Sequence, residues 1–284
     1  MRTPKSALYL NFAIATVRKL ATASRLEQFE RLFSGLPESL VPTHFSEDEP
    51  IRDRFDIGDI SRLQGMMLKP GGADILFAMR GKSSGSMQLS ATLGPRVDSN
   101  RVSYSIELKR DADVSLVAPV RTLFERMVTW ADASWAGLGL ACHVKGGGWQ
   151  ADYEPQGVRW RSVQIVETGE WGATLACLPS FKWITVLGAP YVRFLGEERL
   201  RQAPVFRAFT DDDSRLWLQF SQNPEEAFEP DSVALVERLR MELDSGDNFC
   251  RMPTFEERVS GGTKYRTPDL DRSELRDSCP SEVP

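Results

Sequence analysis

Cysteine and histidine are scarce in this sequence, which has four cysteines and two histidines among its 284 residues. Cys142, Cys177, Cys250 and Cys279 show no Cys-x-x-Cys spacing, and only Cys142 has a histidine, His143, beside it. On a strand these two neighbours would point to opposite faces and could not share a metal ion. We therefore expect reduced thiols, no metal site and no cofactor.

Long apolar runs are also absent, because no stretch approaches the roughly 18 apolar residues that a transmembrane helix needs. Residues 7–15 are mostly apolar and follow two basic residues, as in a signal peptide. However, Asn11 interrupts them, and Arg18 and Lys19 precede the only segment that resembles a cleavage site. We expect a strand here rather than an export signal, and a cytoplasmic protein without membrane contact.

A basic surface is missing as well. The 35 Lys and Arg residues are outnumbered by 40 Asp and Glu residues, which gives a net charge of −5 and a pI near 5.3. Proteins that bind nucleic acids neutralise phosphates with a basic face, so this balance argues against direct nucleic-acid binding and favours a basic protein partner. Apolar residues make up 41% of the chain, which is enough for a substantial core.

The segment 171–222 carries the clearest strand pattern of the chain. Its aromatic and β-branched residues form four runs, at 171–178, 182–188, 206–210 and 216–220. Pro190-Tyr191 should start a helix, and the last two runs should form a hairpin. Trp183 and Trp217 are expected to be buried in the sheet core, as most tryptophans are.

Alternation and helical spacing predict further elements. The predicted strands span residues 8–14, 74–79, 87–93, 101–109, 138–144 and 158–166. The predicted helices begin at a capping box formed by Ser24 and Glu27, at Asp113 or Ser115 with an apolar stripe reaching Trp135, at Tyr191 and at Asp231. Residues 41–59 are polar and acidic, which is typical of a solvated connection.

Hairpins that alternate with helices, without a regular β-α-β order, indicate an α+β protein with mainly antiparallel sheets packed by helices. We expect an N-terminal segment at 1–84, a domain at 85–250 and a disordered C-terminal tail at 251–284. The tail is expected because apolar content falls after Phe255 while glycine, proline and charged residues increase.

One set of residues could carry catalysis. Asp98, Glu107 and Lys109 have the spacing of metal-dependent nucleases, in which two carboxylates hold a divalent cation and a lysine stabilises the attacking water. The simpler interpretation is that Glu107 and Lys109 belong to the polar side of a strand whose other side is core. We favour this interpretation and expect that the protein is not an enzyme.

Carboxylates gather around the predicted hairpin and could bind a partner. The candidate partner-binding residues are Asp211, Asp212 and Asp213 in its turn, followed by Glu225 and Glu226. Mutual repulsion should keep the three turn carboxylates in water, which predicts an exposed, negative tip. The alternative is a solubilising edge, and Glu47, Asp48 and Glu49 are a secondary choice for a docking surface.

The tract 182–191, KWITVLGAPY, follows Glu170-Trp171-Gly172 and resembles bacterial polymorphic-toxin immunity proteins, most nearly the immunity protein 52 family. The resemblance covers about residues 85–245. It implies an acidic α+β antitoxin without catalytic residues, encoded beside a toxin that has a restriction-endonuclease-like domain and is delivered by type VI secretion. On this basis we expect an inhibitor that blocks the active site of a cognate nuclease effector. The alternatives are a metal-dependent nuclease and an adaptor that loads an effector without inhibiting it.

Overall fold

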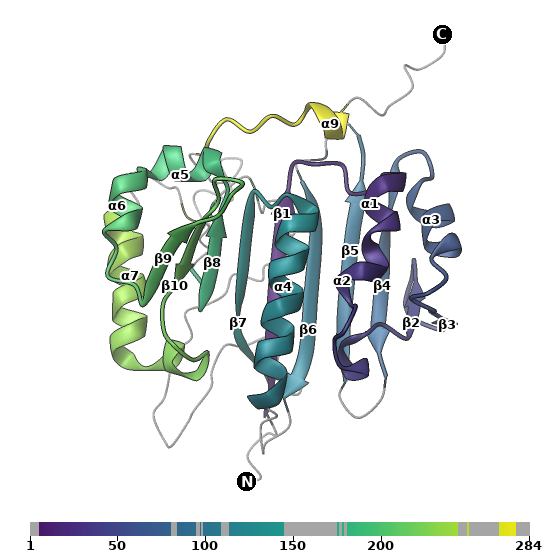
Figure 1. Ribbon diagram of the computed structural model, residues 1–284, viewed down its shortest axis with the longest axis horizontal. Coiled ribbons are helices and arrows are strands. Elements are labelled where there is room, and N and C mark those ends of the chain that lie inside the picture. Colours follow the sequence, from purple (N-terminus) through teal and green to yellow (C-terminus); the bar gives the residue numbers. More distant parts are fainter. Residues whose placement is uncertain are drawn as a thin grey trace, which may run out of the picture.

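The computed structural model describes residues 6–80, 84–94, 97, 99–108, 114–144, 175, 178, 181–243, 249 and 267–276. Within these residues the chain forms a sheet of ten strands with helices packed on it (Figure 1). The strand order is β3-β2-β4-β5-β6-β1-β7-β8-β10-β9, and neighbouring strands are antiparallel. The predicted α+β class with antiparallel pairing is therefore confirmed.

The strands and helices have the following bounds. The strands are β1 (Ser6–Thr16), β2 (His44–Ser46), β3 (Asp53–Arg54), β4 (Gly72–Met79), β5 (Gly85–Thr92), β6 (Asn100–Leu108), β7 (Trp135–Val144), β8 (Ile184–Leu187), β9 (Arg207–Thr210) and β10 (Leu216–Gln219). The α-helices are α1 (Ala23–Glu27), α2 (Phe29–Leu32), α3 (Ser61–Met67), α4 (Val117–Ala131), α5 (Ala189–Leu195), α6 (Glu197–Arg201), α7 (Pro230–Leu243) and α9 (Ser273–Arg276). Short 3-10 helices cover Glu38–Leu40, Val114–Leu116 and Glu225–Phe228.

The first strand lies in the middle of the sheet, hydrogen-bonded to β6 on one side and to β7 on the other. Its alternation is as predicted, with Leu10, Phe12 and Ile14 buried on one face. Phe12 stacks on Tyr104 of β6, with ring centroids 5.0 Å apart, and contacts Phe124 of α4. These contacts fix the register, because a shift by one residue would turn the apolar side chains to the other face.

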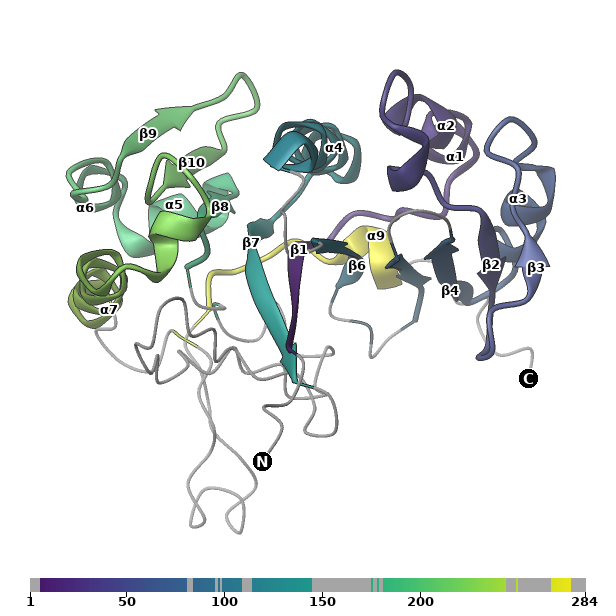
Figure 2. The same ribbon diagram turned by 90° about the horizontal axis from the view of Figure 1, so that it is seen from below.

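Helices cover the two faces of the sheet in different regions (Figure 2). Helices α1 to α4 lie on one face, over a core that includes the apolar stripe of α4. A second core, which contains Tyr191, Leu200, Leu218 and Leu239, lies on the opposite face of β8 and β10 under α5, α6 and α7. Adjacent residues of β10 belong to the two cores, because side chains alternate along a strand.

Helix α4 is shorter than predicted at both ends. It ends at Ala131 because Asp132 adopts a left-handed conformation (φ 50°, ψ 62°), so Trp135 begins β7 instead of extending the helix. At the other end Leu116 is the N-cap residue and makes no side-chain cap bond. Ser115 is therefore not the cap, and Asp113 lies outside the described residues.

The segment 41–59 is not only a solvated connection, and this prediction was wrong. It supplies β2 and β3, and Phe45 and Phe55 are buried there. Both rings pack against Phe77 of β4, and Phe29 of α2 completes the cluster. Burial of two aromatic side chains outweighs the polar composition, since the acidic residues around them are free to face water.

Helix starts and interruptions also differ from the sequence prediction. The cap of α1 is Thr22, whose hydroxyl accepts a hydrogen bond from the N–H of Arg25, so the predicted capping box of Ser24 and Glu27 does not form. The predicted helix at 191–200 is two helices, because Gly196 at φ 93° separates α5 from α6. Helix α7 starts at Pro230, ahead of the predicted Asp231 cap.

The domain division at residues 84 and 85 stays a prediction, and the sheet runs across it because β4 and β5 are hydrogen-bonded neighbours.

Within the predicted tail, residues 267–276 pack on the domain and bury Leu270 and Leu275. The N–H of Gly94 donates to the carbonyl of Leu275 at 3.0 Å. These ten residues therefore have a defined structure, although they lie within the predicted disordered tail. The predicted strand at 158–166 lies outside the described residues.

Candidate functional site

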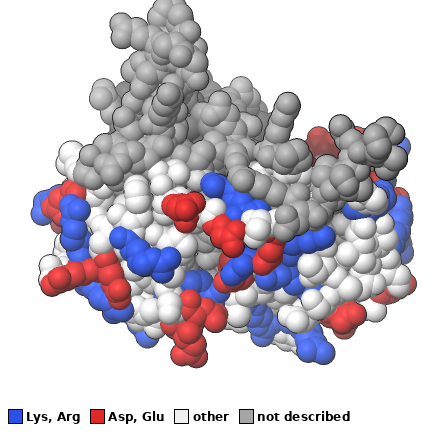
Figure 3. Space-filling model, turned by 90° about the horizontal axis from the view of Figure 1, so that it is seen from above, with Lys and Arg blue, Asp and Glu red and all other residues white. Residues whose placement is uncertain are grey.

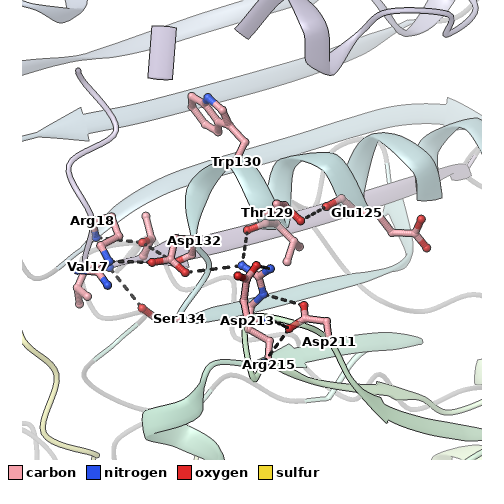
Figure 4. A network of polar contacts seen from close by, with 12 residues as sticks. Val17, Arg18, Glu125, Thr129, Trp130, Asp132, Ser134, Asp211, Asp213 and Arg215 are labelled. Carbon is pink, nitrogen blue, oxygen red and sulfur yellow. Dashed lines mark hydrogen bonds and ion pairs between the residues drawn. The ribbon is translucent and has the colours of Figure 1, made fainter. Parts of the chain in front are cut away.

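The predicted hairpin of β9 and β10 is present, and a buried arginine holds its turn (Figure 4). Arg215 is only 3% exposed although it immediately precedes β10. Its Nε donates to Oδ2 of Asp211 at 2.8 Å, and its Nη2 pairs with the carboxylate of Asp213. Burial of a charged group is costly unless it is paired, so these carboxylates make the position of Arg215 tolerable.

The carboxylate of Asp211 accepts four hydrogen bonds. Oδ1 accepts from the backbone N–H groups of Asp213 (3.1 Å) and Arg215 (2.9 Å). Oδ2 accepts from Nε of Arg215 and from the indole Nε1 of Trp217, each at 2.8 Å. Burial raises the pKa of Asp211, but the bonds from Trp217 and Arg215 outweigh it, so the net pKa lies below the usual value.

The turn is tied to distant parts of the chain through alternating charges. Arg215 lies 3.6 Å from Oδ1 of Asp132, the residue that ends α4, and Asp132 accepts from Nε of Arg18 at 2.8 Å. Arg18 in turn pairs with Glu274 of α9 at 2.8 Å. The hydrogen bond with Asp132 is the main reason that the pKa of Arg18 is raised. One network, called here the Arg215 network, therefore joins the hairpin, α4, the end of β1 and α9.

The structure assigns different environments to the three turn aspartates. Asp211 and Asp213 belong to the Arg215 network, whereas Asp212 is exposed and makes no hydrogen bond or ion pair with another described residue. The sequence prediction of an exposed negative tip therefore holds for Asp212 and also for Asp213, whose side chain is 56% exposed, whereas Asp211 is mostly enclosed. Arg215 was missed, although its place four residues after Asp211 is the signal that could have found it.

The two remaining candidates, Glu225 and Glu226, lie at the other end of β10 from the turn. Glu226 accepts from the N–H groups of Gln222 and Asn223 and from Nδ2 of Asn223 at 2.7 Å. The bonds from Asn223 are the main cause of the lowered pKa of Glu226. Glu225 is exposed. The two groups of carboxylates thus lie at opposite ends of β10.

Charges of both signs are interleaved on the face seen from above in Figure 3, where Lys and Arg lie beside Asp and Glu. The secondary candidates show the same mixing at the far end of the sheet, since Glu47 pairs with Lys69 at 3.0 Å while Asp48 and Glu49 are exposed. The net charge of the chain is therefore not displayed as a continuous acidic surface on the visible described face.

The nuclease-like set is described only in part. Glu107 lies on β6, opposite Tyr9 of β1, and accepts a hydrogen bond from the hydroxyl of Ser84. Burial and then the charge of Glu107 raise the pKa of Tyr9. Asp98 and Lys109 lie outside the described residues. In the described part of the chain no group of three or more His, Cys, Asp or Glu side chains could hold a metal ion.

The tryptophan tract 182–191 is a structural element of the second half. Trp183 is 4% exposed, and its Nε1 donates to the carbonyl of Ser221 at 2.9 Å. The tract continues through β8, which is buried throughout, to the start of α5. Trp217 is 7% exposed and stacks on Phe209 of β9 at 5.7 Å. Both tryptophans are therefore core residues, as predicted.

No family model matches the sequence, and no curated protein matches it. Among solved structures the fold is similar to that of the Pseudomonas aeruginosa T6SS protein PA0821, with a TM-score of 0.52 and 14% sequence identity. The match covers 84% of this chain and 77% of that protein. At this identity the likeness establishes a shared fold. None of the described helices has the length and apolarity to cross a membrane.

Proposed function

We propose that this chain is an immunity protein, a cytoplasmic antitoxin that binds and neutralises a cognate effector of a type VI secretion system. The observation that carries the proposal is the fold shared with a T6SS protein over 84% of the chain. The tract 182–191, which resembles the immunity protein 52 family, supports the same class. It forms the buried β8 and the start of α5, so the resemblance rests on residues that build the domain.

We propose further that the effector is a nuclease whose active site is blocked. A nuclease presents Lys and Arg to hold phosphates, and a protein with a net charge of −5 can supply complementary carboxylates. Asp212 and Glu225 are the candidates available for this contact, because both are exposed and neither is used by an ion pair within the described residues. Asp211 and Asp213 would attract a basic partner through their charge but would form no new ion pair with it, since both are already paired with Arg215.

The test is co-expression with the toxin gene encoded beside this one, followed by growth and pull-down assays. The wild-type chain should restore growth and co-purify with the effector. The variants Asp212→Lys and Glu225→Lys should slow association by about threefold to tenfold and weaken its dependence on salt, because exposed charges act mainly on the encounter rate. Reversal of Asp211 or Asp213 is unsuitable as a test, since it would disrupt the pairing of Arg215.

The matched control is Glu38→Lys, which reverses an equally exposed carboxylate in the N-terminal half. It should bind and protect as the wild type does. Unaltered association in both test variants would remove Asp212 and Glu225 from the docking surface. Failure of the wild type to protect a cell that makes the neighbouring toxin would refute the immunity role, and cleavage of DNA or RNA by the purified chain with Mg²⁺ would replace it with the enzyme alternative.

A further inference from the structure

Strand β9 is the last strand at one end of the sheet (Figure 2). It has four residues, Arg207–Thr210, and within the described part of the chain it pairs only with β10. An edge strand carries a row of backbone donors and acceptors that can pair with another strand.

The hydrogen bonds of the turn identify the outward groups. The N–H of Asp211 donates to the carbonyl of Arg215 at 3.0 Å, so these two residues form a hydrogen-bonded pair of the hairpin. Because such pairs alternate along an antiparallel ladder, Phe209 and Arg207 also point their backbone groups at β10. The N–H and C=O groups of Ala208 and Thr210 therefore point away from it, and no described residue bonds to them.

The two ends of the sheet differ in how they are protected. At the far end β3 has only two residues, and its Asp53 is held in an ion pair by Arg62. Short, charged edge strands of this kind resist pairing. Residues 206–210 contain neither proline nor lysine, and Phe206 is 57% exposed beside the strand. The edge at β9 is longer than β3 and has Phe206 exposed beside it, but it is also short, its Arg207 is charged and exposed, and Arg201 of α6 donates to the hydroxyl of Thr210 at 2.6 Å. Its outward backbone groups are nevertheless without a partner among the described residues.

We infer that β9 pairs with β9 of a second copy of this chain, antiparallel and about a two-fold axis at Phe209. In this register Ala208 of one copy faces Thr210 of the other, so the four outward-pointing residues of the two strands form hydrogen-bonded pairs. A register shifted by one residue would place outward groups opposite groups that are already bonded to β10. Alternation also permits registers shifted by two residues, but the register about Phe209 is the one that pairs all four outward-pointing residues with one another.

The side chains are complementary in the same register. Each Phe209 would meet the other in a non-hydrogen-bonded pair, in which Cα atoms lie about 4.5 Å apart. Phe209 is already fixed by Trp217 on one side and by the guanidinium of Arg207, 4.7 Å from its ring centroid. Arg207 would lie opposite Asp211 of the second copy, whose carboxylate is already bonded to Arg215 and Trp217, so the two charges would attract each other without a new hydrogen bond. The cross-strand pair of aromatic rings is favourable.

This self-complementarity is the reason to choose a second copy over a strand of another protein. The interface is short, so weak association that depends on protein concentration is expected. The inference is independent of the immunity role, because it concerns the chain without its effector.

The first measurement is sedimentation equilibrium of the full-length chain, which has a mass of 31.9 kDa, between about 1 and about 200 µM. A concentration-dependent dimer is expected. Arg207→Glu should weaken it by about tenfold or more, because a carboxylate then faces Asp211 of the second copy. The control Arg238→Glu, which alters an exposed arginine of α7, should dimerise as the wild type does.

The second measurement tests the register. Ala208→Cys and Thr210→Cys proteins are mixed and oxidised, and disulfides are mapped by mass spectrometry. Paired residues would have Cα atoms about 5.5 Å apart, within the range for a disulfide, whereas two copies of the same variant are diagonal neighbours and lie farther apart. The 208–210 link should therefore exceed the 208–208 and 210–210 links several-fold.

Three results would overturn the inference. These are a 31.9 kDa monomer at every concentration, a dimer that Arg207→Glu leaves unchanged, and a 208–210 link no more abundant than the links within single-variant samples.

Discussion

At the scale of single residues, Arg215 explains why the acidic turn folds as it does. A buried guanidinium requires anionic partners, and Asp211, Asp213 and Asp132 supply them from two segments far apart in sequence. The sequence indicated the aspartates through their charge, but it could not indicate that α4 would bring Asp132 to the turn. From their charge alone the turn aspartates were predicted to be exposed, whereas the fold determines which of them are paired with Arg215.

The pH dependence of stability provides the test of Asp211. A carboxylate with a depressed pKa in the folded state stabilises the protein at pH values above its unfolded pKa of about 3.9, and this contribution is lost as the pH falls through the folded pKa. We expect the free energy of unfolding of the wild type to decrease more steeply below about pH 4 than that of Asp211→Asn. Urea denaturation between about pH 2.5 and 6 measures this difference.

Asp212→Asn is the matched control for this experiment, because Asp212 is the exposed neighbour without a described partner. It should keep the wild-type steepness. Equal steepness in all three proteins would show that the bonds to Asp211 do not persist in solution.

At the scale of elements, alternation was the most informative signal. Strands β1, β4, β5 and β6 each bury one face, so the period of two in their sequences predicted them. Strands β2 and β3 were missed because they are short and lie among acidic residues. Helix α4 was extended too far because Trp135 continues its apolar stripe, and only the left-handed conformation of Asp132 ends it.

The start of β4 allows a test of how an element is joined to its neighbour. Gly71 (φ 85°) and Gly72 (φ 74°) are adjacent and both have positive φ. A Cβ atom added at Gly71 would have no atom within 4 Å, whereas one added at Gly72 would lie 1.9 Å from the carbonyl oxygen of Ala91. Gly71→Ala should therefore cost only backbone strain of about 1–2 kcal/mol. Gly72→Ala should cost at least about 2 kcal/mol more, because β4 and β5 must separate locally.

The free energies of unfolding of the two glycine variants, compared by chemical denaturation, measure the difference. Similar losses in both would mean that the chain relaxes at this junction without disturbing the pairing of β4 with β5.

At the scale of the whole molecule, the sequence could not give the strand order. The order places β1 between β6 and β7, and the C-terminal segment 267–276 returns to contact Gly94 and Arg18. Such pairings depend on three-dimensional packing of segments with similar local patterns, so composition predicted loss of structure where Leu270 and Leu275 are in fact buried. The prediction of the candidate site failed for the same reason, because Glu225 is near the turn in sequence but lies at the other end of β10.

The packing of the C-terminal segment can be tested at Leu275, which is fully buried. Leu275→Ala should lower the free energy of unfolding by about 2–5 kcal/mol, because it removes buried apolar volume. Met241→Ala, at a side chain that is 71% exposed on α7, should change it by less than about 0.5 kcal/mol. Equal stability of the two variants would contradict the docking of α9 on the domain.

The central place of β1 has a consequence for synthesis. This strand leaves the ribosome before either of its partners exists, and β7, the later of the two, is complete only at Val144. At ordinary rates of translation the ribosome needs on the order of ten seconds to make the intervening chain. Both edges of β1 are unpaired until β6 is complete at Leu108, and the edge that faces β7 stays unpaired to the end of the interval, so chaperones that bind nascent chains would meet this strand while it is exposed.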